Sequence, residues 1–134
     1  MKELAQLYRE AQLYAHMAHN LASGPSFFED HEFFADAYTA YEKAYDAVVE
    51  RMIGQSAGQD LAQTLLDINK AACSDLEVAS NNSGCLGYLL IMEIKICAQI
   101  SKDVPDSTDG TQNLLQGLAD ESEQRQYFIQ QRLK

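Results

Sequence analysis

The stretch between Pro25 and Gly54 constrains the fold most, because it predicts a single long helix. Ser26 followed three residues later by Glu29 has the pattern of a capping box, which places the helix start at Ser26. Gly54 ends the helix after about Ile53. Its apolar and aromatic positions recur at helical spacing, and we expect most of them to pack in a core or an interface. They are Phe27, Phe34, Tyr38, Tyr41, Tyr45, Val48, Val49 and Met52.

Three other long stretches and one short stretch have the same helical spacing. The predicted helices cover about Lys2–Ala22, Asp60–Cys73, Cys85–Ser101 and a last segment that Thr111 is expected to cap. Ser23-Gly24-Pro25 ends the first helix, and a polar loop from Asp103 to Gly110 precedes the last. Four main helices joined by short loops predict an all-α, antiparallel four-helix bundle over residues 1–134, one domain. The short helix lies in the connection between the second and third main helices.

Composition narrows the classes of partner. The chain has 134 residues and a formal net charge of −10, so nucleic-acid phosphate and anionic lipid would repel it, whereas cations would be attracted. The three cysteines, Cys73, Cys85 and Cys97, include no CxxC pair and match neither a zinc motif nor a disulfide framework. We therefore expect a reduced, cytoplasmic protein, with Cys97 as a small core residue. The apolar run Cys85–Met92 is short for a membrane span, and the chain start has no apolar signal region.

Two imidazoles and two carboxylates at fixed intervals are the clearest chemical feature. His19 is near the end of the first helix and His31 is in the second turn of the next, where Asp46 and Glu50 share a face four residues apart. Imidazole with carboxylate is a ligand set that suits iron and other borderline divalent metals. His31 and Asp46 are about 22 Å apart along one helix, at about 1.5 Å per residue. They can share an ion only if a second copy of the chain supplies half of the site.

A metal site inside one bundle is disfavoured, because the di-iron sites of such bundles use Glu-x-x-His and no Asp or Glu here has His three residues later. Two copies of the long helix packed antiparallel about a two-fold axis would instead place His31 of one chain opposite Asp46 and Glu50 of the other. A two-fold interface would form two such sites.

The same segment resembles the Dps family, the ferritin-like proteins named for protecting DNA in starved cells. The family motif, His-Trp-Asn-x-x-Gly-Pro-x-Phe-Phe-x-x-His followed by an acid, a tyrosine, an aspartate and a Glu-Arg pair, is matched without a gap. The matching residues are His19, Gly24, Pro25, Phe27, Phe28, His31, Glu32, Tyr38, Asp46, Glu50 and Arg51. The resemblance implies a ferritin-like bundle that assembles as two-fold dimers into a hollow dodecamer. It also implies that His19 and His31 of one subunit bind iron with Asp46 and Glu50 of its neighbour, oxidise Fe(II), often with hydrogen peroxide, and store ferric iron.

Two departures from the family pattern bear on the chemistry of the site. The family has an acid four residues after the second histidine, where this chain has Ala35, with Asp36 one position out of phase. Asn20 stands where the family has a tryptophan that is thought to intercept radicals. Nearby tyrosines, among them Tyr14, Tyr38, Tyr41 and Tyr45, are candidates to replace it.

Three functions remain open. The first is a ferroxidase and iron-storage cage that limits oxidative damage. The second is a DNA-compacting relative, disfavoured because the chain has no basic tail. The third is a non-enzymatic oligomer whose degraded site binds zinc or no metal, which Ala35 favours.

Other polar residues have simpler expected roles. We expect His16 to be an ordinary polar residue. Glu29, Asp30 and Glu32 should complement the helix dipole, with Asp30 or Glu32 also able to steer cations. We expect Glu121 and Glu123 to lie on a solvated face or, in a shell-like assembly, on an iron access path or inner surface.

Overall fold

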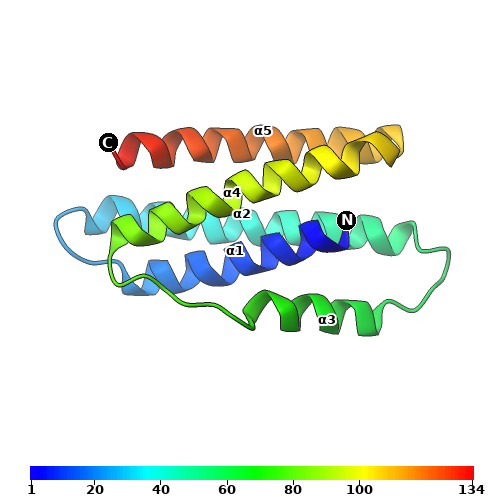
Figure 1. Ribbon diagram of the computed structural model, residues 1–134, viewed down its shortest axis with the longest axis horizontal. Coiled ribbons are helices and arrows are strands. Elements are labelled where there is room, and N and C mark those ends of the chain that lie inside the picture. The colour runs from blue at the N-terminus through cyan, green and yellow to red at the C-terminus, as the bar shows by residue number, and fades with distance from the viewer.

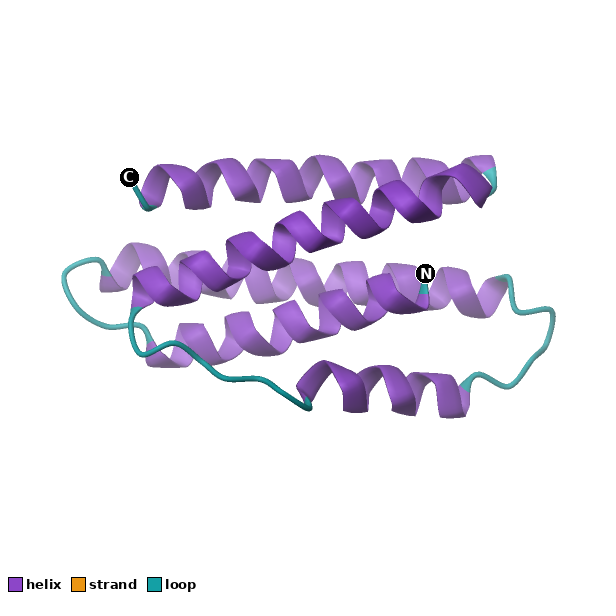
Figure 2. Cartoon of the chain, viewed as in Figure 1, coloured by secondary structure: helices purple, strands orange, loops and turns teal.

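Helices form almost the whole chain in the computed structural model, which describes residues 1–134 (Figure 2). They are α1 (Lys2–Leu21), α2 (Phe27–Gly54), α3 (Ala62–Cys73), α4 (Asn82–Asp103) and α5 (Asp109–Arg132), with a 3₁₀ turn, η1 (Val104–Asp106), before α5. This order confirms the predicted all-α bundle of four main helices with a short helix between the second and third.

The long helices form two antiparallel hairpins, α1–α2 and α4–α5 (Figure 1). The chain returns between them through α3, which packs along α1 on the side away from α5. Because of this return, α2 and α4 run in the same direction. Polar contacts tie α2 to α5 at both ends: Arg132 binds Asp30 at one end, and Thr111 accepts hydrogen bonds from Arg51 and Gln55 at the other.

The buried side chains of the four long helices, together with Ile68 of α3, form one core. Helix α1 buries one apolar side, which includes Leu4, Tyr8, Ala11, Ala15 and Ala18. Helix α4 is long and apolar enough to cross a membrane by length and composition alone. In this structure many apolar side chains of α4 are part of the buried core. They include Leu86, Leu89, Met92, Ile96 and Ile100.

One of the two predicted helix caps is confirmed in position only, and the other is wrong. Ser26 does precede α2, but its hydroxyl accepts a hydrogen bond from Arg132 Nη2 at 2.6 Å and caps no backbone N–H. Thr111 lies inside α5, and Thr108 is the cap, accepting a hydrogen bond from the Thr111 N–H. The Ser26 hydroxyl is engaged by another helix, which local sequence does not reveal. The Thr111 cap is wrong because α5 begins earlier, at Asp109.

Helix α4 begins earlier and ends later than predicted. Asn81 caps it by accepting a hydrogen bond from the Gly84 N–H at 2.7 Å, so the helix starts at Asn82. It continues to Asp103 and leads into η1, where a loop was expected.

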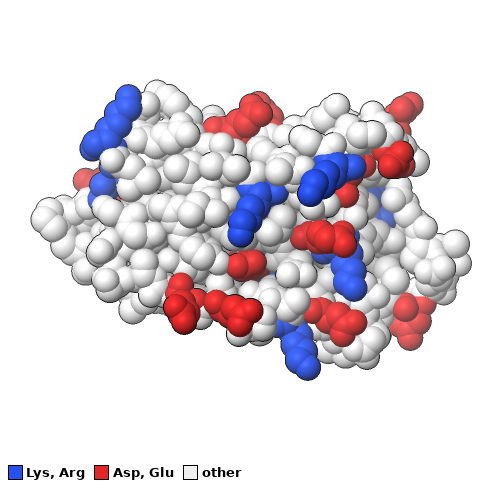
Figure 3. Space-filling model, in the orientation of Figure 1, with Lys and Arg blue, Asp and Glu red and all other residues white.

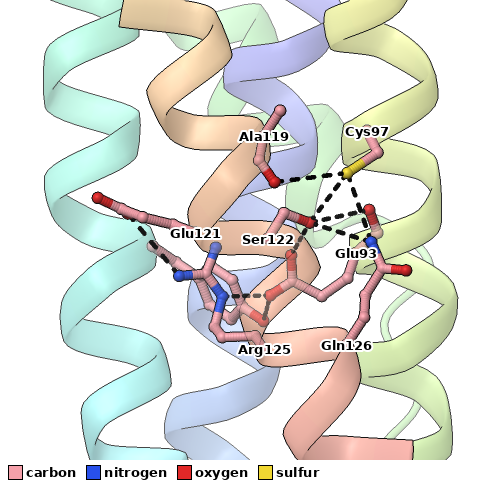
Figure 4. A network of polar contacts seen from close by, with 8 residues as sticks. Glu93, Cys97, Ala119, Glu121, Ser122, Arg125 and Gln126 are labelled. Carbon is pink, nitrogen blue, oxygen red and sulfur yellow. Dashed lines mark hydrogen bonds and ion pairs between the residues drawn. The ribbon is translucent and has the colours of Figure 1, made fainter.

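A charged cluster lies at the centre of the bundle (Figure 4). Glu93 of α4 is fully buried and accepts hydrogen bonds from Tyr41 of α2 at 2.5 Å, from Ser122 of α5 at 2.5 Å and from Arg125 of α5. Burial, and after it the Glu93 carboxylate, raise the pKa of the Tyr41 hydroxyl, which keeps that group a proton donor. In the sequence, this cluster is indicated only by Glu93, a single acidic residue within an apolar stretch.

Cys97 is partly buried beside this cluster, and its thiol lies 3.3 Å from the Ser122 hydroxyl. It contacts polar groups and is not part of the buried core, so its predicted role as a small core residue is wrong. Cys73 is exposed and Cys85 is buried, and all three cysteines are free thiols.

Removing one partner of the buried ion pair should destabilise the bundle strongly. Arg125→Met leaves the Glu93 carboxylate buried without a countercharge, and we expect it to lower the free energy of unfolding by about 3 kcal/mol. The double variant Glu93→Gln/Arg125→Met leaves no buried charge and should recover most of the loss. Urea denaturation measures both, and an Arg125→Met protein as stable as the parent would contradict this account of the cluster.

Candidate functional site

His19 and His31 meet where α1 ends and α2 begins. Their rings stack with centroids 3.8 Å apart and planes 21° apart. Nδ1 of His19 lies 2.9 Å from the carbonyl oxygen of His31, and Nδ1 of His31 lies 2.9 Å from the carbonyl oxygen of His19. Each imidazole therefore donates a hydrogen bond to the backbone of the other residue. The bond to the His19 carbonyl also satisfies one of the free acceptors in the last turn of α1.

This reciprocal bonding fixes which nitrogen of each ring carries the proton. A carbonyl oxygen only accepts, so both Nδ1 atoms are protonated and both Nε2 atoms keep a lone pair. A backbone bond at one ring nitrogen that leaves the other free is the usual arrangement of metal-binding histidines, because it sets ring orientation and raises ligand basicity. The pair is therefore chemically suited to bind a metal ion.

Aromatic rings hold the pair on both sides. Phe27 stacks on His31 with centroids 4.8 Å apart, and Tyr38 meets His19 edge-on at 5.5 Å. Tyr38 also stacks on His16, with ring centroids 4.2 Å apart. His16 is exposed, and its ring centroid lies 6.3 Å from that of His19. Phe27 and Tyr38, expected as packing residues, thus pack directly on the candidate ligands.

An ion pair with a buried carboxylate anchors the loop that joins the two histidines. Asp30 is 2% exposed and binds Arg132 through both oxygens, at 2.9 and 2.8 Å. Asn82 of α4 donates to Asp30 at 2.9 Å and makes two hydrogen bonds with the backbone of Ser23. Asp30 does lie in the first turn of α2, as expected, but it is paired and is not free to steer cations.

The electrostatics of Asp30 follow from these partners. Burial by itself favours the neutral acid, but the hydrogen bonds from Arg132, Asn82 and Ser26 outweigh it, so the pKa of Asp30 is lowered from 3.8. The carboxylate is therefore charged in the folded protein at every pH above that value. The ion pair could not be predicted from the sequence, because Asp30 and Arg132 are 102 residues apart along the chain.

Asp46 and Glu50 lie farther along α2, one turn apart and both exposed. Neither takes part in an ion pair, so both carboxylates are free to bind a cation. The straight helix keeps Asp46 about 22 Å from His31. No group of three or more His, Cys, Asp or Glu within the chain could hold a metal ion. The two histidines and the two carboxylates are therefore separate groups within one chain.

Asp36 does not take the place of the acid that is missing at Ala35. It lines a groove between α2 and α5 with Lys43 and Glu121, and it is about 140° around the helix from His31. Glu121 is exposed and 3.9 Å from Arg125, and Glu123 is exposed. On the face shown in Figure 3 the basic side chains are scattered and form no continuous patch.

Comparison with known proteins gives a structural likeness. No protein-family model matches the chain, and a search of curated proteins finds no match. Among solved structures, the chain is similar to a mutant of Mycobacterium smegmatis Dps1, with a TM-score of 0.76 over 99% of this chain and 91% of that chain. The two sequences are 17% identical. At this identity the likeness shows the fold, which is the ferritin-like helical bundle of that protein.

The Asp30–Arg132 pair should make stability depend on acid pH. Because the pKa of Asp30 is lower folded than unfolded, its contribution is complete above pH 3.8 and is lost as the pH falls through the folded pKa. We expect the parent to lose stability below pH 3.8 more steeply than Asp30→Asn/Arg132→Gln, which lacks the titrating pair. Urea denaturation at pH 6 and at about pH 3 tests this, and equal slopes for the two proteins would refute it.

The reciprocal histidine bonds should contribute measurably to stability. His31→Phe keeps a ring against Phe27 but removes the bond to the His19 carbonyl, so we expect a loss of about 1 kcal/mol. The matched control is His16→Phe, since His16 is exposed and makes no such bond, and it should change little. Thermal or urea denaturation distinguishes them, and equal effects of the two substitutions would argue against the bond.

Proposed function

We propose that this protein is a Dps-like iron protein, which binds Fe(II) between two copies of the chain, oxidises it and stores the ferric product in a hollow oligomer. The observation that carries the proposal is the divided site. His19 and His31 present two free Nε2 lone pairs, and the unpaired carboxylates of Asp46 and Glu50 lie too far along α2 to reach them. The match to the Dps motif and the likeness to the Mycobacterium smegmatis protein support the same conclusion.

One side of α2 supports pairing with a second copy. Taking about 100° per residue, an arc about 100° wide begins at His31 and includes Asp46 and Glu50. The arc also contains Phe28 and Ile53, which are 80% and 47% exposed in the single chain. Ala35, Thr39 and Glu42 lie on the arc between them. In the proposed pairing, a second copy of the chain would cover both of these exposed apolar side chains.

The arc is self-complementary in antiparallel register. In an antiparallel pair of helices, the numbers of two residues that face each other have a constant sum, which defines the register. The sum is about 77 when His31 faces the partner subunit's Asp46, and about 81 when it faces the partner subunit's Glu50. Phe28 and Ile53 also sum to 81, so each Phe28 would pack on an Ile53 of the other copy. The Phe28–Ile53 pairing thus agrees with the register that places His31 opposite the partner subunit's Glu50, and the register that uses Asp46 is shifted from it by about one helical turn.

The chemistry assigns a role to each side chain. Imidazole nitrogens and carboxylate oxygens together suit iron, and the carboxylates favour the ferric product, which is the harder ion. Each Fe(II) gives one electron to the oxidant. Hydrogen peroxide would take two electrons and two protons and leave as two water molecules, and dioxygen is the other candidate oxidant. The chain's net charge of −10 suits storage of cations within an oligomer, and we expect a dodecamer.

A second candidate function has one specific observation in its favour. Ala35 stands where a Dps protein has an acid, which leaves the second metal position without its usual ligand from the same helix. In this alternative the oligomer binds zinc or no metal and does not oxidise iron. Metal analysis of the purified protein, with a curve of iron loading, separates the two.

Mixing two inactive variants tests whether the site lies between chains. His31→Ala and Asp46→Ala should each oxidise Fe(II) much more slowly than the parent, because every site would lack a ligand. In a mixed dimer one site lacks both residues and the other is intact. Refolding the two variants together at equal amounts should therefore restore about one quarter of the parental sites.

Fe(II) oxidation followed by the absorbance of the ferric product is the measurement. The control is each variant refolded alone, and native mass reports whether the oligomer forms. Parental activity in either single variant would refute the ligand assignment, and no recovery in the mixed protein would refute the shared site.

A further inference from the structure

We propose that the phenyl ring of Phe28 packs into a crevice on the other copy of the chain, beside Gly54 of that copy, and so fixes the register of the α2–α2 pair. The inference rests on the proposed function, since it assigns a specific contact to the same two-fold interface. The ring lies near one end of α2 and the crevice near the other, so a two-fold axis would form the contact twice.

Phe28 is the most exposed of the large apolar side chains, with 80% of its surface accessible. Phe27 meets it edge-on with ring centroids 5.3 Å apart, and Phe27 itself stacks on His31. The Phe28 ring therefore projects from the first turn of α2, next to the histidine pair. A covered aromatic side chain buries about 150–250 Å², so this residue would gain more from a partner than any other on its side of α2.

The crevice lies near the other end of α2, between that helix and α5. It has a volume of about 460 Å³ and a lining of small, apolar and polar residues, which are Ala47, Glu50, Arg51, Gly54, Gln55 and Leu114. Gly54 is exposed, and a side-chain carbon at its position would have no neighbouring atom within 4 Å. The space beside Gly54 is thus open to a side chain that comes from another copy.

The wall of the crevice carries a cation that suits an aromatic ring. Arg51 takes part in no ion pair, and its Nη1 donates a hydrogen bond to the Thr111 hydroxyl at 3.1 Å, which holds the guanidinium group in place. The face of an aromatic ring attracts a guanidinium group that lies within about 6 Å of the ring centre. An aliphatic side chain makes no such interaction, so the crevice is better suited to phenylalanine.

The register in which paired numbers sum to 81 brings the ring to this crevice. In that register the partner's Phe28 is level with Gly54 to within about one residue, whereas a sum of 77 would place it level with Val49, about one turn away. Around the helix, Gly54 is about 40° beyond Glu50, the last residue of the arc. Since Glu50 faces the partner's His31 in the same register, the ring would lie about one turn from the shared ion and cover that end of the site.

Tryptophan fluorescence tests the contact without any metal, because the chain has no tryptophan of its own. In Phe28→Trp the emission should be that of a water-exposed indole in dilute protein, and it should shift to shorter wavelength as the concentration rises and copies associate. Phe28→Trp/Gly54→Leu should keep the exposed emission, because leucine fills the crevice. The matched control Phe28→Trp/Gly117→Leu changes an exposed glycine of α5 with equally open surroundings and should shift as Phe28→Trp does.

The affinity between copies gives a second measure, followed by native mass over a dilution series. Gly54→Leu and Phe28→Ala should each raise the concentration of half-dissociation at least about tenfold, whereas Gly117→Leu should change it little. Circular dichroism checks that Gly54→Leu still folds, which we expect because the new side chain would touch nothing in its own chain. Phe28→Ala/Gly54→Leu should associate more tightly than Gly54→Leu, because leucine then occupies space that the ring has left.

The outcomes distinguish this inference from the proposed function. An oligomer in which Phe28→Trp keeps the exposed emission overturns the placement of the ring and leaves the assignment of the iron ligands intact. Association of Gly54→Leu as tight as that of the parent overturns the crevice as its binding place, with the same limit. A parent that stays monomeric at every concentration overturns the two-fold pairing, and with it the proposed function.

Discussion

The rigidity of α2 determines what this molecule can do. A continuous helix fixes the distance between any two of its residues, so the imidazole near its start and the carboxylates near its far end never meet within one chain. Only a second copy running in the opposite direction can bring them together. The remaining helices keep α2 straight and leave one of its sides accessible, and α3 contributes by packing on α1 instead of crossing that side.

The two buried carboxylates, Glu93 and Asp30, each link α2, α4 and α5. Glu93 and Arg125 join α4 to α5 and, through Tyr41, to α2. Asp30 and Arg132 join the start of α2 to the end of α5, with Asn82 bringing in α4. Such pairs contribute less net stability than apolar packing of equal volume, but their geometry tolerates little displacement. The second pair adjoins the histidines, so fold and site share the same anchor.

The sequence was sufficient to predict the helices, their order and the distance that separates Asp46 and Glu50 from the two histidines. These features depend on the spacing of apolar residues and on the rise per residue of a helix, which are both properties of a single helix. The Glu93 cluster, the Asp30–Arg132 pair and the true roles of Ser26 and Thr111 were not predicted. Each of them depends on contacts between side chains from different helices. Which side chains meet is determined only when the helices pack together. The reciprocal histidine bonds belong to the same class, although the residues themselves were identified.

The exposed side of α2 has a consequence for how the protein behaves in solution. Phe28 and Ile53 keep most or much of their surface in water when the chain is alone, and water is a poor solvent for them. Any association that covers them favours the folded form by mass action, because an unfolded chain has no such ordered side to offer. If a second copy of the chain is what covers them, the melting temperature would rise with protein concentration and fall on dilution.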